Sequence, residues 1–332
     1  MHAIRHHAFG PPEVLALEDV PDPSPAPGQV LVAVTAHGVH LLDTTIRRGE
    51  AGGPLPLPDL PTIPGREVAG TVAAVGQGVP GSWVGRRVVA HLGPVRDGGG
   101  YARLATVAAD SLFALPDSLD AADAVAMIGT GRTTLMVLDT AAITSDDVVV
   151  VTAAAGGIGS LAVQTALAAG ARVLALAGGP AKVRAVRGLV PDAGEQLAVV
   201  DYLADTWRGG ADAALGRLTA GTTPGATVLL DGVGGAAGTT AAGLLRHGGR
   251  AVAYGWASGE PADGLPEHVE VRPVVGPGAP TPANLRPYQE RALALAASGT
   301  WRVLTHRFPL AEAARAHREL EERRTTGKVV LV

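Results

Sequence analysis

One stretch of the sequence constrains the fold more than any other. The apolar run Asp147–Thr152 leads directly into Ala153-Ala-Ala-Gly-Gly-Ile-Gly159, and a helical pattern over Ile158–Ala169 follows. Glycines between a buried strand and a helix let the backbone approach a pyrophosphate, and the positive end of the helix dipole attracts its charge. The stretch therefore predicts the first turn of a dinucleotide-binding domain. The alternative is a purely structural turn, in which two adjacent glycines would cost stability without a ligand.

The residues that flank this turn predict a parallel sheet. From about residue 126, short apolar segments alternate with helical ones. Further strands are expected at Arg172–Ala177, Leu197–Asp201, Ala226–Asp231, Arg250–Gly255 and Val269–Val275. Apolar strands joined by helices are typical of a parallel sheet covered on both faces, and six of them complete a doubly wound dinucleotide-binding sheet.

The rest of the chain indicates a second domain. Residues 1–125 contain short β-branched segments separated by Gly and Pro, which predicts strands and turns. After the proline-rich stretch 276–287, a further helix, a strand, a second helix and the segment Lys328–Val332 follow, too much chain for a simple cap. We therefore expect a β domain over residues 1–125, completed by 280–332, and a dinucleotide-binding domain over 126–279.

Composition excludes several classes of protein and site. A length of 332 residues suits two domains, and a net charge of -4 argues against a nucleic-acid binder. No apolar run approaches the ~18 residues that span a membrane, and the N-terminus lacks a signal-peptide core, so we expect a cytoplasmic protein. The chain has no cysteine, which removes disulfides, cysteine nucleophiles and thiolate metal sites.

The end of the second expected strand indicates which dinucleotide binds. An NAD site usually carries Asp or Glu here, but the sequence reads Ala177-Gly-Gly-Pro-Ala-Lys182. Two glycines, a helix start at Pro180 and a cation in its first turn would accept a 2′-phosphate, which favours NADPH. The alternative is that Lys182 is an ordinary solvated lysine, but Lys182 and Lys328 are the only lysines in the chain.

Several motifs together resemble a known family. They are Pro64-Gly-Arg-Glu-Val-Ala-Gly-Thr-Val72, the turn Ala155–Gly159 with Gln164, Gly248-Gly-Arg250, Phe308-Pro-Leu-Ala-Glu312 and Gly327-Lys328. On these residues the chain resembles the medium-chain dehydrogenase/reductase superfamily, in its zinc-free quinone oxidoreductase and enoyl reductase branch. The resemblance implies an α/β fold with a GroES-like β-barrel catalytic domain, a Rossmann doubly wound parallel six-stranded sheet, and NADPH between the two domains.

The resemblance also implies site residues. The cofactor would contact Thr130, Ala155, Gly156, Gly157, Ile158, Gly178, Lys182, Tyr202, Val233, Gly255, Arg323 and Lys328. From the sequence alone, Tyr202 could equally be a tyrosine at the edge of the core, and Arg323 a charge at a helix C-terminus. The substrate pocket would be lined by Thr45, Leu57, His91 and Trp256, which suits a small planar conjugated molecule.

Zinc is not expected. The positions that hold catalytic zinc ligands in zinc-dependent relatives carry His40, Arg66 and Thr130 here, and a cation at the central position opposes a metal ion. Without a strong Lewis acid, hydride transfer suits an already activated acceptor such as a quinone or an α,β-unsaturated carbonyl. The alternatives are a tailoring enoyl reductase of secondary metabolism and a non-catalytic, crystallin-like NADPH-binding protein.

The catalytic group is open at this point. Many relatives carry a tyrosine two residues after the aspartate that corresponds to Asp43, and this chain has Thr45 there. Thr45 or His40 could orient a carbonyl or a water, or could simply line the pocket. For Asp43 and Glu67, a structural salt bridge, for example of Glu67 with a nearby arginine, is the simpler interpretation.

The resemblance finally implies a homodimer. The expected sixth strand, residues 269–275, would lie at the sheet edge, and two such edges could pair across a two-fold axis.

Overall fold

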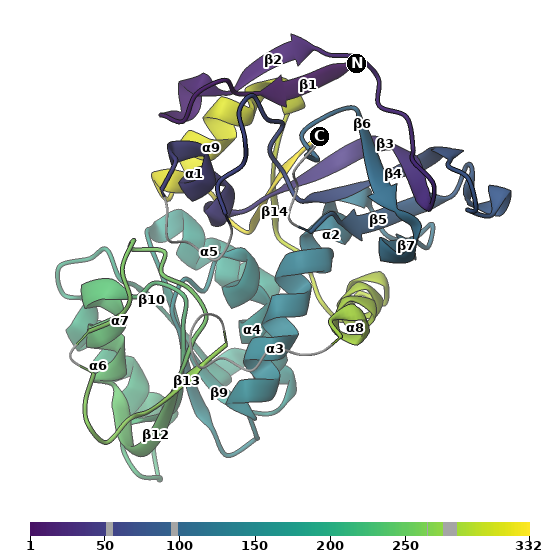
Figure 1. Cartoon of the computed structure of the whole chain (residues 1–332). Helices are drawn as coiled ribbons and strands as arrows, with labels where there is room; N and C mark the ends of the chain where they lie inside the picture. Colours follow the sequence, from purple (N-terminus) through teal and green to yellow (C-terminus); the bar gives the residue numbers. More distant parts are fainter. Residues whose placement is uncertain (51–55, 94–98, 264, 275–283) are drawn as a thin grey trace. The chain divides into compact units, whose positions relative to one another are not determined.

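The computed structural model describes residues 1–50, 56–93, 99–263, 265–274 and 284–332. It divides the chain into two compact units (Figure 1). Unit 1 comprises Met1–Gly131 and Gln289–Val332, and unit 2 comprises Arg132–Tyr288. The C-terminal segment therefore belongs to the same unit as the N-terminal residues. The boundaries between the units follow residues 131 and 288. The boundaries expected from the sequence followed residues 125 and 279.

Unit 1 is built on a β-sheet with the strand order β14-β15-β3-β4-β5-β7, and β6 also pairs with β3. Its strands are β3 (Gln29–Val39), β4 (Glu67–Val75), β5 (Arg87–His91), β6 (Leu104–Ala108), β7 (Leu112–Ala114), β14 (Thr305–Phe308) and β15 (Lys328–Leu331). The separate pair β1 (His2–Arg5) and β2 (Ala16–Asp19) is antiparallel. Because β15 pairs with β3, the last strand of the chain lies beside one of the first.

Unit 1 also contains helices. They are α1 (Leu41–Arg48), α2 (Ala121–Ala126), a π-helical segment (Met127–Gly131), α9 (Ala313–Glu321) and 3₁₀ turns at Pro12–Val14, Gly81–Trp83, Ala109–Ser111 and Leu310–Glu312. Helix α8 (Arg286–Ala297) crosses the second division of the chain.

The expectation of strands and turns alone before residue 125 was wrong at α1 and α2. Thr44 and Thr45 favour strands by intrinsic preference, but local contacts outweigh that preference. The Asp43 carboxylate accepts a hydrogen bond from the His40 N–H at 2.7 Å, which satisfies one of the free donors at the start of α1. Gly49 then ends α1 with a left-handed φ of 79°.

Unit 2 contains the six-stranded parallel sheet that the sequence predicted. Its strand order is β10-β9-β8-β11-β12-β13. The strands are β8 (Val148–Val151), β9 (Arg172–Ala177), β10 (Leu197–Asp201), β11 (Ala226–Asp231), β12 (Leu245–Ala253) and β13 (Glu270–Pro273). The helices are α3 (Arg132–Ala141), α4 (Gly157–Ala168), α5 (Pro180–Leu189), α6 (Trp207–Leu218) and α7 (Gly235–Ala242), with a 3₁₀ turn at Gly194–Gln196. Within the described part of the chain β13 is an edge strand, and residue 275 of the predicted strand lies outside the described residues.

Helices cover both faces of this sheet because its strands are apolar on both sides. Val149 and Val151 of β8 pack in one core with residues of α3, α4 and α5. Val148 and Val150 of the same strand pack in the opposite core with residues of α6 and α7. This confirms the doubly wound arrangement.

Among the residues that the structure describes, no helix has the length and apolar character needed to cross a membrane.

Candidate functional site

The glycine-rich turn of unit 2 lies where the chain order of the sheet reverses. β8 is flanked by β9, which follows it in the chain, and by β11, which starts the other half of the sheet. Ligands of open α/β sheets bind beyond the carboxyl ends of the strands at such a switch point. The turn that follows β8 is therefore in the expected position for a dinucleotide site.

Close packing defines the shape of this turn. Ala153 adopts a left-handed φ of 47°, and Gly156 is the extended residue before α4. A Cβ on Gly159 would overlap the carbonyl oxygen of Ala153, so only glycine fits there. The first N–H groups of α4, from Gly157 and Ile158, have no earlier turn of helix to bind and can receive an anion.

Polar contacts join the carboxyl ends of three strands. The buried Asp231 carboxylate accepts hydrogen bonds from the Thr152 hydroxyl at 2.7 Å and from the Val233 N–H at 3.0 Å. The Tyr254 hydroxyl donates to the carbonyl of Thr152 at 3.2 Å. Gly255 packs against the carbonyl of Gly232. The predicted contacts Val233 and Gly255 are thus placed at one edge of the sheet with the glycine-rich turn.

A second group of predicted cofactor residues in unit 2 lies at the carboxyl ends of the neighbouring strands β9 and β10. A Cβ on Gly178 would stand 2.9 Å from the Tyr202 hydroxyl oxygen, so these two predicted cofactor residues touch. Lys182 lies in the first turn of α5, which starts directly after Gly179. Sequence reasoning missed Asp201, whose carboxylate accepts hydrogen bonds from the N–H groups of Gly179 at 2.7 Å and Leu203 at 3.0 Å. Asp201 thereby fixes the turn.

Unit 1 contains a buried charge cluster centred on Glu67. The Glu67 carboxylate is fully buried, with Oε1 2.7 Å from His40 Nε2 and Oε2 2.9 Å from Lys328 Nζ. Lys328 is 6% exposed and His40 is 22% exposed. Lys328 therefore neutralises Glu67 inside unit 1, and its assignment to the cofactor stays a prediction.

The charges set the protonation states of this cluster. Burial raises the pKa of Glu67, but His40 and Lys328 outweigh burial and bring that pKa well below its usual range. Burial lowers the pKa of His40 more than the Glu67 carboxylate raises it. Glu67 is therefore an anion beside the Lys328 ammonium.

Strand register explains how Glu67 reaches Lys328. β3 lies between β4 and β15, with Gly38 opposite Val330 of β15. A Cβ on Gly38 would overlap Glu67 Oε2, and a Cβ on Gly129 would overlap Glu67 Oε1. Two glycines thus make the space that the carboxylate fills.

A second buried carboxylate, Asp43, is also paired. Its Oδ1 lies 3.3 Å from Arg66 Nε, and the Tyr101 hydroxyl donates to Oδ2 at 3.5 Å. Burial raises the pKa of Asp43, but Arg66, His40 and the His40 backbone N–H together outweigh burial, and the pKa lies below its ordinary value. Both carboxylates are therefore in salt bridges, Asp43 with Arg66 and Glu67 with Lys328 instead of an arginine.

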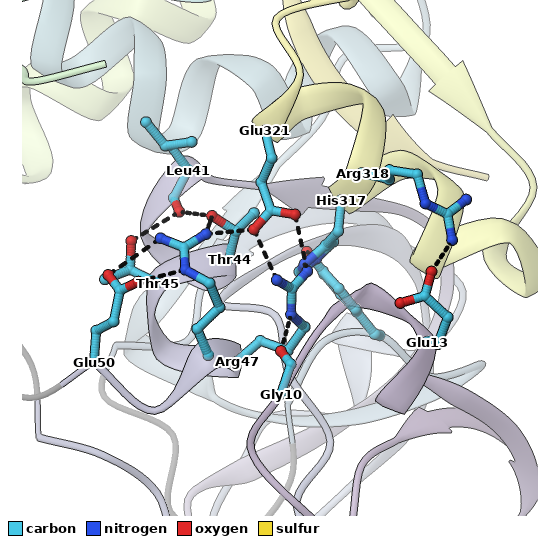
Figure 2. Close-up of polar contacts among 12 residues, drawn as sticks. Gly10, Glu13, Leu41, Thr44, Thr45, Arg47, Glu50, His317, Arg318 and Glu321 are labelled. Carbon is cyan, nitrogen blue, oxygen red and sulfur yellow. Dashed lines mark hydrogen bonds and ion pairs between the residues drawn. The ribbon is translucent and has the colours of Figure 1, made fainter. Parts of the chain in front are cut away.

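The network continues toward the surface of unit 1 through His317, Arg47 and Glu321 (Figure 2). Tyr101 lies 3.1 Å from His317 Nε2, and His317 Nδ1 lies 3.4 Å from a guanidinium nitrogen of Arg47. Arg47 is 1% exposed and donates to the Gly10 carbonyl at 3.1 Å and to Glu321 at 2.7 Å. This network holds α1 against α9.

The remaining predicted site residues lie at different positions in units 1 and 2. The Thr45 hydroxyl donates to the Leu41 carbonyl at 3.4 Å, within α1 (Figure 2). His91 ends β5, is paired in register with Glu67, and its Nδ1 accepts from the Gly93 N–H. Thr130 is buried in the π-helical segment, and Arg323 follows α9 with a left-handed φ of 60°. Leu57 of unit 1 is half-buried, and Trp256 of unit 2 is 45% exposed.

Sequence reasoning missed Tyr101, His317, Gly38 and Gly129. The residues that they contact lie far away in the chain, so no local pattern marks them. Gly100-Tyr101 and Ala316-His317 carry no motif with a chemical role of its own.

Comparison with known proteins assigns this architecture. Residues 26–117 match the alcohol dehydrogenase GroES-like domain, and residues 198–331 match the zinc-binding dehydrogenase domain. A quinone oxidoreductase of Pseudomonas aeruginosa is 34% identical over 341 residues, covering 99% of this chain and 98% of that protein. The chain belongs to the medium-chain dehydrogenase/reductase superfamily.

Solved structures of this superfamily agree over the whole chain. The Escherichia coli quinone oxidoreductase complexed with NADPH has a TM-score of 0.81 and 28% identity, with all of both chains covered. An NAD-dependent alcohol dehydrogenase has a TM-score of 0.82 and 30% identity, covering 100% of this chain and 99% of its own. The names of these related structures therefore differ in cofactor and activity. The cofactor and substrate proposed for this chain must be argued from its own residues.

Proposed function

We propose that this oxidoreductase uses NADPH, without zinc, to reduce a quinone or an α,β-unsaturated carbonyl. The observation that carries the proposal is the pairing of charges in unit 1. Arg66 neutralises Asp43 and Lys328 neutralises Glu67, so both buried carboxylates already have a cation of the chain beside them. A zinc ion next to these pairs would add positive charge with no anion left to balance it.

Because we propose no zinc or other Lewis acid, the substrate must be one that accepts hydride without such help. A simple ketone or alcohol needs polarisation before hydride transfer, whereas a quinone or an enone accepts hydride at an electron-poor carbon by itself. The quinone oxidoreductase of Pseudomonas aeruginosa, related over the full length, supports a quinone. We propose a small planar conjugated substrate, with Thr45, Leu57, His91 and Trp256 as its contact residues.

The proposed cofactor fits two places in unit 2. The pyrophosphate would bind at the turn Ala155–Ile158, where the N-terminus of α4 offers free N–H groups. The 2′-phosphate would bind at Gly178, Lys182 and Tyr202, where the Asp201 carboxylate is already bound by two backbone N–H groups. NADPH, when bound, supplies the hydride. Thr130 and Arg323 are also proposed as contacts.

The experiment is a substrate screen with two cofactors. We expect NADPH oxidation with quinones or enones, unchanged after dialysis against EDTA. A set of primary alcohols with NADP⁺ or NAD⁺ serves as the comparison, because it detects the reaction of an alcohol dehydrogenase. Alcohol oxidation that EDTA abolishes would contradict the proposal. NADPH binding without turnover of any acceptor would favour the non-catalytic alternative.

We further propose a homodimer through residues 269–275. β13 is an edge strand of the described sheet, and Val271 on it is 46% exposed. An edge strand with an exposed apolar side chain can pair with a second copy of itself across a two-fold axis.

A further inference from the structure

Strand β10 leaves one side of its backbone unpaired. It is the first strand in the order of the unit 2 sheet and, within the described residues, pairs only with β9. The Tyr202 N–H donates to the Ala177 carbonyl at the end of β9 at 3.1 Å, so every second residue before Tyr202 faces β9 in the same way. Leu197 and Val199 therefore turn their backbone N–H and C=O groups to the open side, where an extended chain can pair with them.

This edge lacks the features that ordinarily keep other chains from pairing with a sheet. Natural edge strands carry lysines, prolines or bulges for that purpose. Residues 197–200 are Leu, Ala, Val and Val, and their register with β9 is regular. Their side chains are half-buried, so they do not cover the backbone with charge. The open side of β10 is therefore a template for an added strand.

The open side of β10 forms the floor of a groove, which we call the edge groove. It has a volume of about 690 Å³ and lies between the C-terminal ends of α5 and α6. Its floor is residues 197–200, and its rim includes the exposed residues Arg187 of α5, Glu195 and Arg217 of α6. Because the floor is half-buried and the rim is exposed, a single extended strand can enter. Two copies of the chain would meet at their rims before their floors could pair.

The rim of the edge groove carries positive charge that is not neutralised. Among the residues that the structure describes, the side chains of Arg187 and Arg217 form no ion pair and no hydrogen bond, and Glu195 on the same rim pairs with neither. Both arginines lie in the last turn of a helix, where the helix dipole favours a cation. That position leaves their guanidinium donors available to a carboxylate, which arginine binds with two parallel hydrogen bonds. The charge therefore favours an acidic occupant.

We propose that the edge groove binds an extended, acidic peptide segment of another protein, which adds a strand beside β10. The peptide backbone pairs with Leu197 and Val199, and its carboxylates bind Arg187 and Arg217. In such strand addition the main-chain hydrogen bonds supply affinity, and the side chains around the groove select the sequence. The inference is independent of the proposed function, because none of these four residues is assigned to cofactor or substrate.

Selection from a random peptide library displayed on phage tests the edge groove in the full-length protein. We expect the enriched peptides to combine alternating β-branched residues with two or more acidic residues. Synthetic copies should bind, and copies with N-methyl groups on alternate backbone amides should not, because the methyl groups remove the donors of an added strand. If no peptide is enriched, or if the N-methylated copies bind as tightly, the proposal is wrong.

Variants of the protein show whether those peptides bind at the edge groove. Arg187→Gln/Arg217→Gln changes only exposed side chains and should weaken binding at least about tenfold, because two charge-assisted contacts are lost. Val199→Pro removes an outward N–H without removing a hydrogen bond to β9, and should weaken binding by a similar factor. Arg184→Gln is the matched control, since Arg184 is an exposed arginine of α5 outside the groove lining, and should leave binding unchanged. Peptides that bind the folded glutamine variant as tightly as the wild type would overturn the proposal.

A second copy of the chain is the other occupant that an open strand could receive. Light scattering of the wild type and of Val199→Pro, without peptide, distinguishes the two. We expect the same mass for both proteins, because the edge groove is vacant until a peptide enters it. A smaller assembly in the folded proline variant would mean that β10 pairs with its own copy, and would overturn the proposal.

Discussion

Two buried histidines of unit 1 should make the protein sensitive to mild acid. His37 on β3 is 2% exposed and bonded to the Gly100 carbonyl, and His317 on α9 is fully buried between Tyr101 and Arg47. Burial lowers the pKa of each from 6.5 to about 4. In the unfolded chain both would titrate near 6.5, so the unfolded state binds more protons between pH 4 and 6.5.

The sign and size of the effect follow from this difference. Stability contributed by the neutral histidines is fully present above pH 6.5 and is lost progressively as the pH falls toward 4. Between pH 7.5 and pH 5 each histidine should cost about 2 kcal/mol of unfolding free energy, or about 4 kcal/mol together. That loss is a large part of the about 5–15 kcal/mol that stabilises an ordinary domain.

Urea unfolding at several pH values measures this directly. Tryptophan fluorescence and circular dichroism give the free energy of unfolding at each pH. The variant His37→Gln/His317→Gln keeps donors and acceptors but cannot titrate, so its slope between pH 5 and 7 should be much smaller. His6 and His40, whose pKa values burial also lowers, would leave a residual slope. An equal slope in wild type and variant would refute the reasoning.

Two further predictions concern packing and assembly. Gly38→Ala and Gly129→Ala would each push a methyl group into the Glu67 carboxylate and should cost roughly 2–4 kcal/mol in chemical denaturation, because the buried ion pairs hold that carboxylate in place. Gly81→Ala, which meets no atom within 4 Å, is the control and should stay within about 0.5 kcal/mol. Val271→Lys on the edge strand β13 should convert the proposed dimer to a monomer in light scattering at micromolar concentration. A wild-type monomer, or a dimer that survives the substitution, would exclude the edge-strand interface.

The parallel sheet and its cofactor turn could be predicted from the sequence because their signals are local. The valine run of β8, the glycines after it and the helix that follows are consecutive in the chain. Likewise, Gly178 and Lys182 are close in sequence to the end of β9. Such features depend on periodicity and turn chemistry, which a single sequence contains.

The charge cluster of unit 1 could not be predicted in the same way. The partners of Glu67 are His40, which precedes α1, and Lys328, which lies on β15. The sequence suggested a nearby arginine as the partner of Glu67, but Arg66, which precedes β4, pairs with Asp43 instead. Helix α1 was missed because its threonines favour strands, while the capping contact of Asp43 becomes visible only in three dimensions.

The most direct test of the proposed function is the cofactor preference at Lys182. The ratio of kcat/KM for NADPH to that for NADH is measured for the wild type and for Lys182→Ala, with whichever quinone or enone the screen identifies. We predict that the wild type prefers NADPH. The variant should lose about 1.5–3 kcal/mol of transition-state binding with NADPH, because one charge-assisted phosphate contact is gone, and should be nearly unchanged with NADH. A wild type that prefers NADH, or a variant equally impaired with both cofactors, would contradict the account.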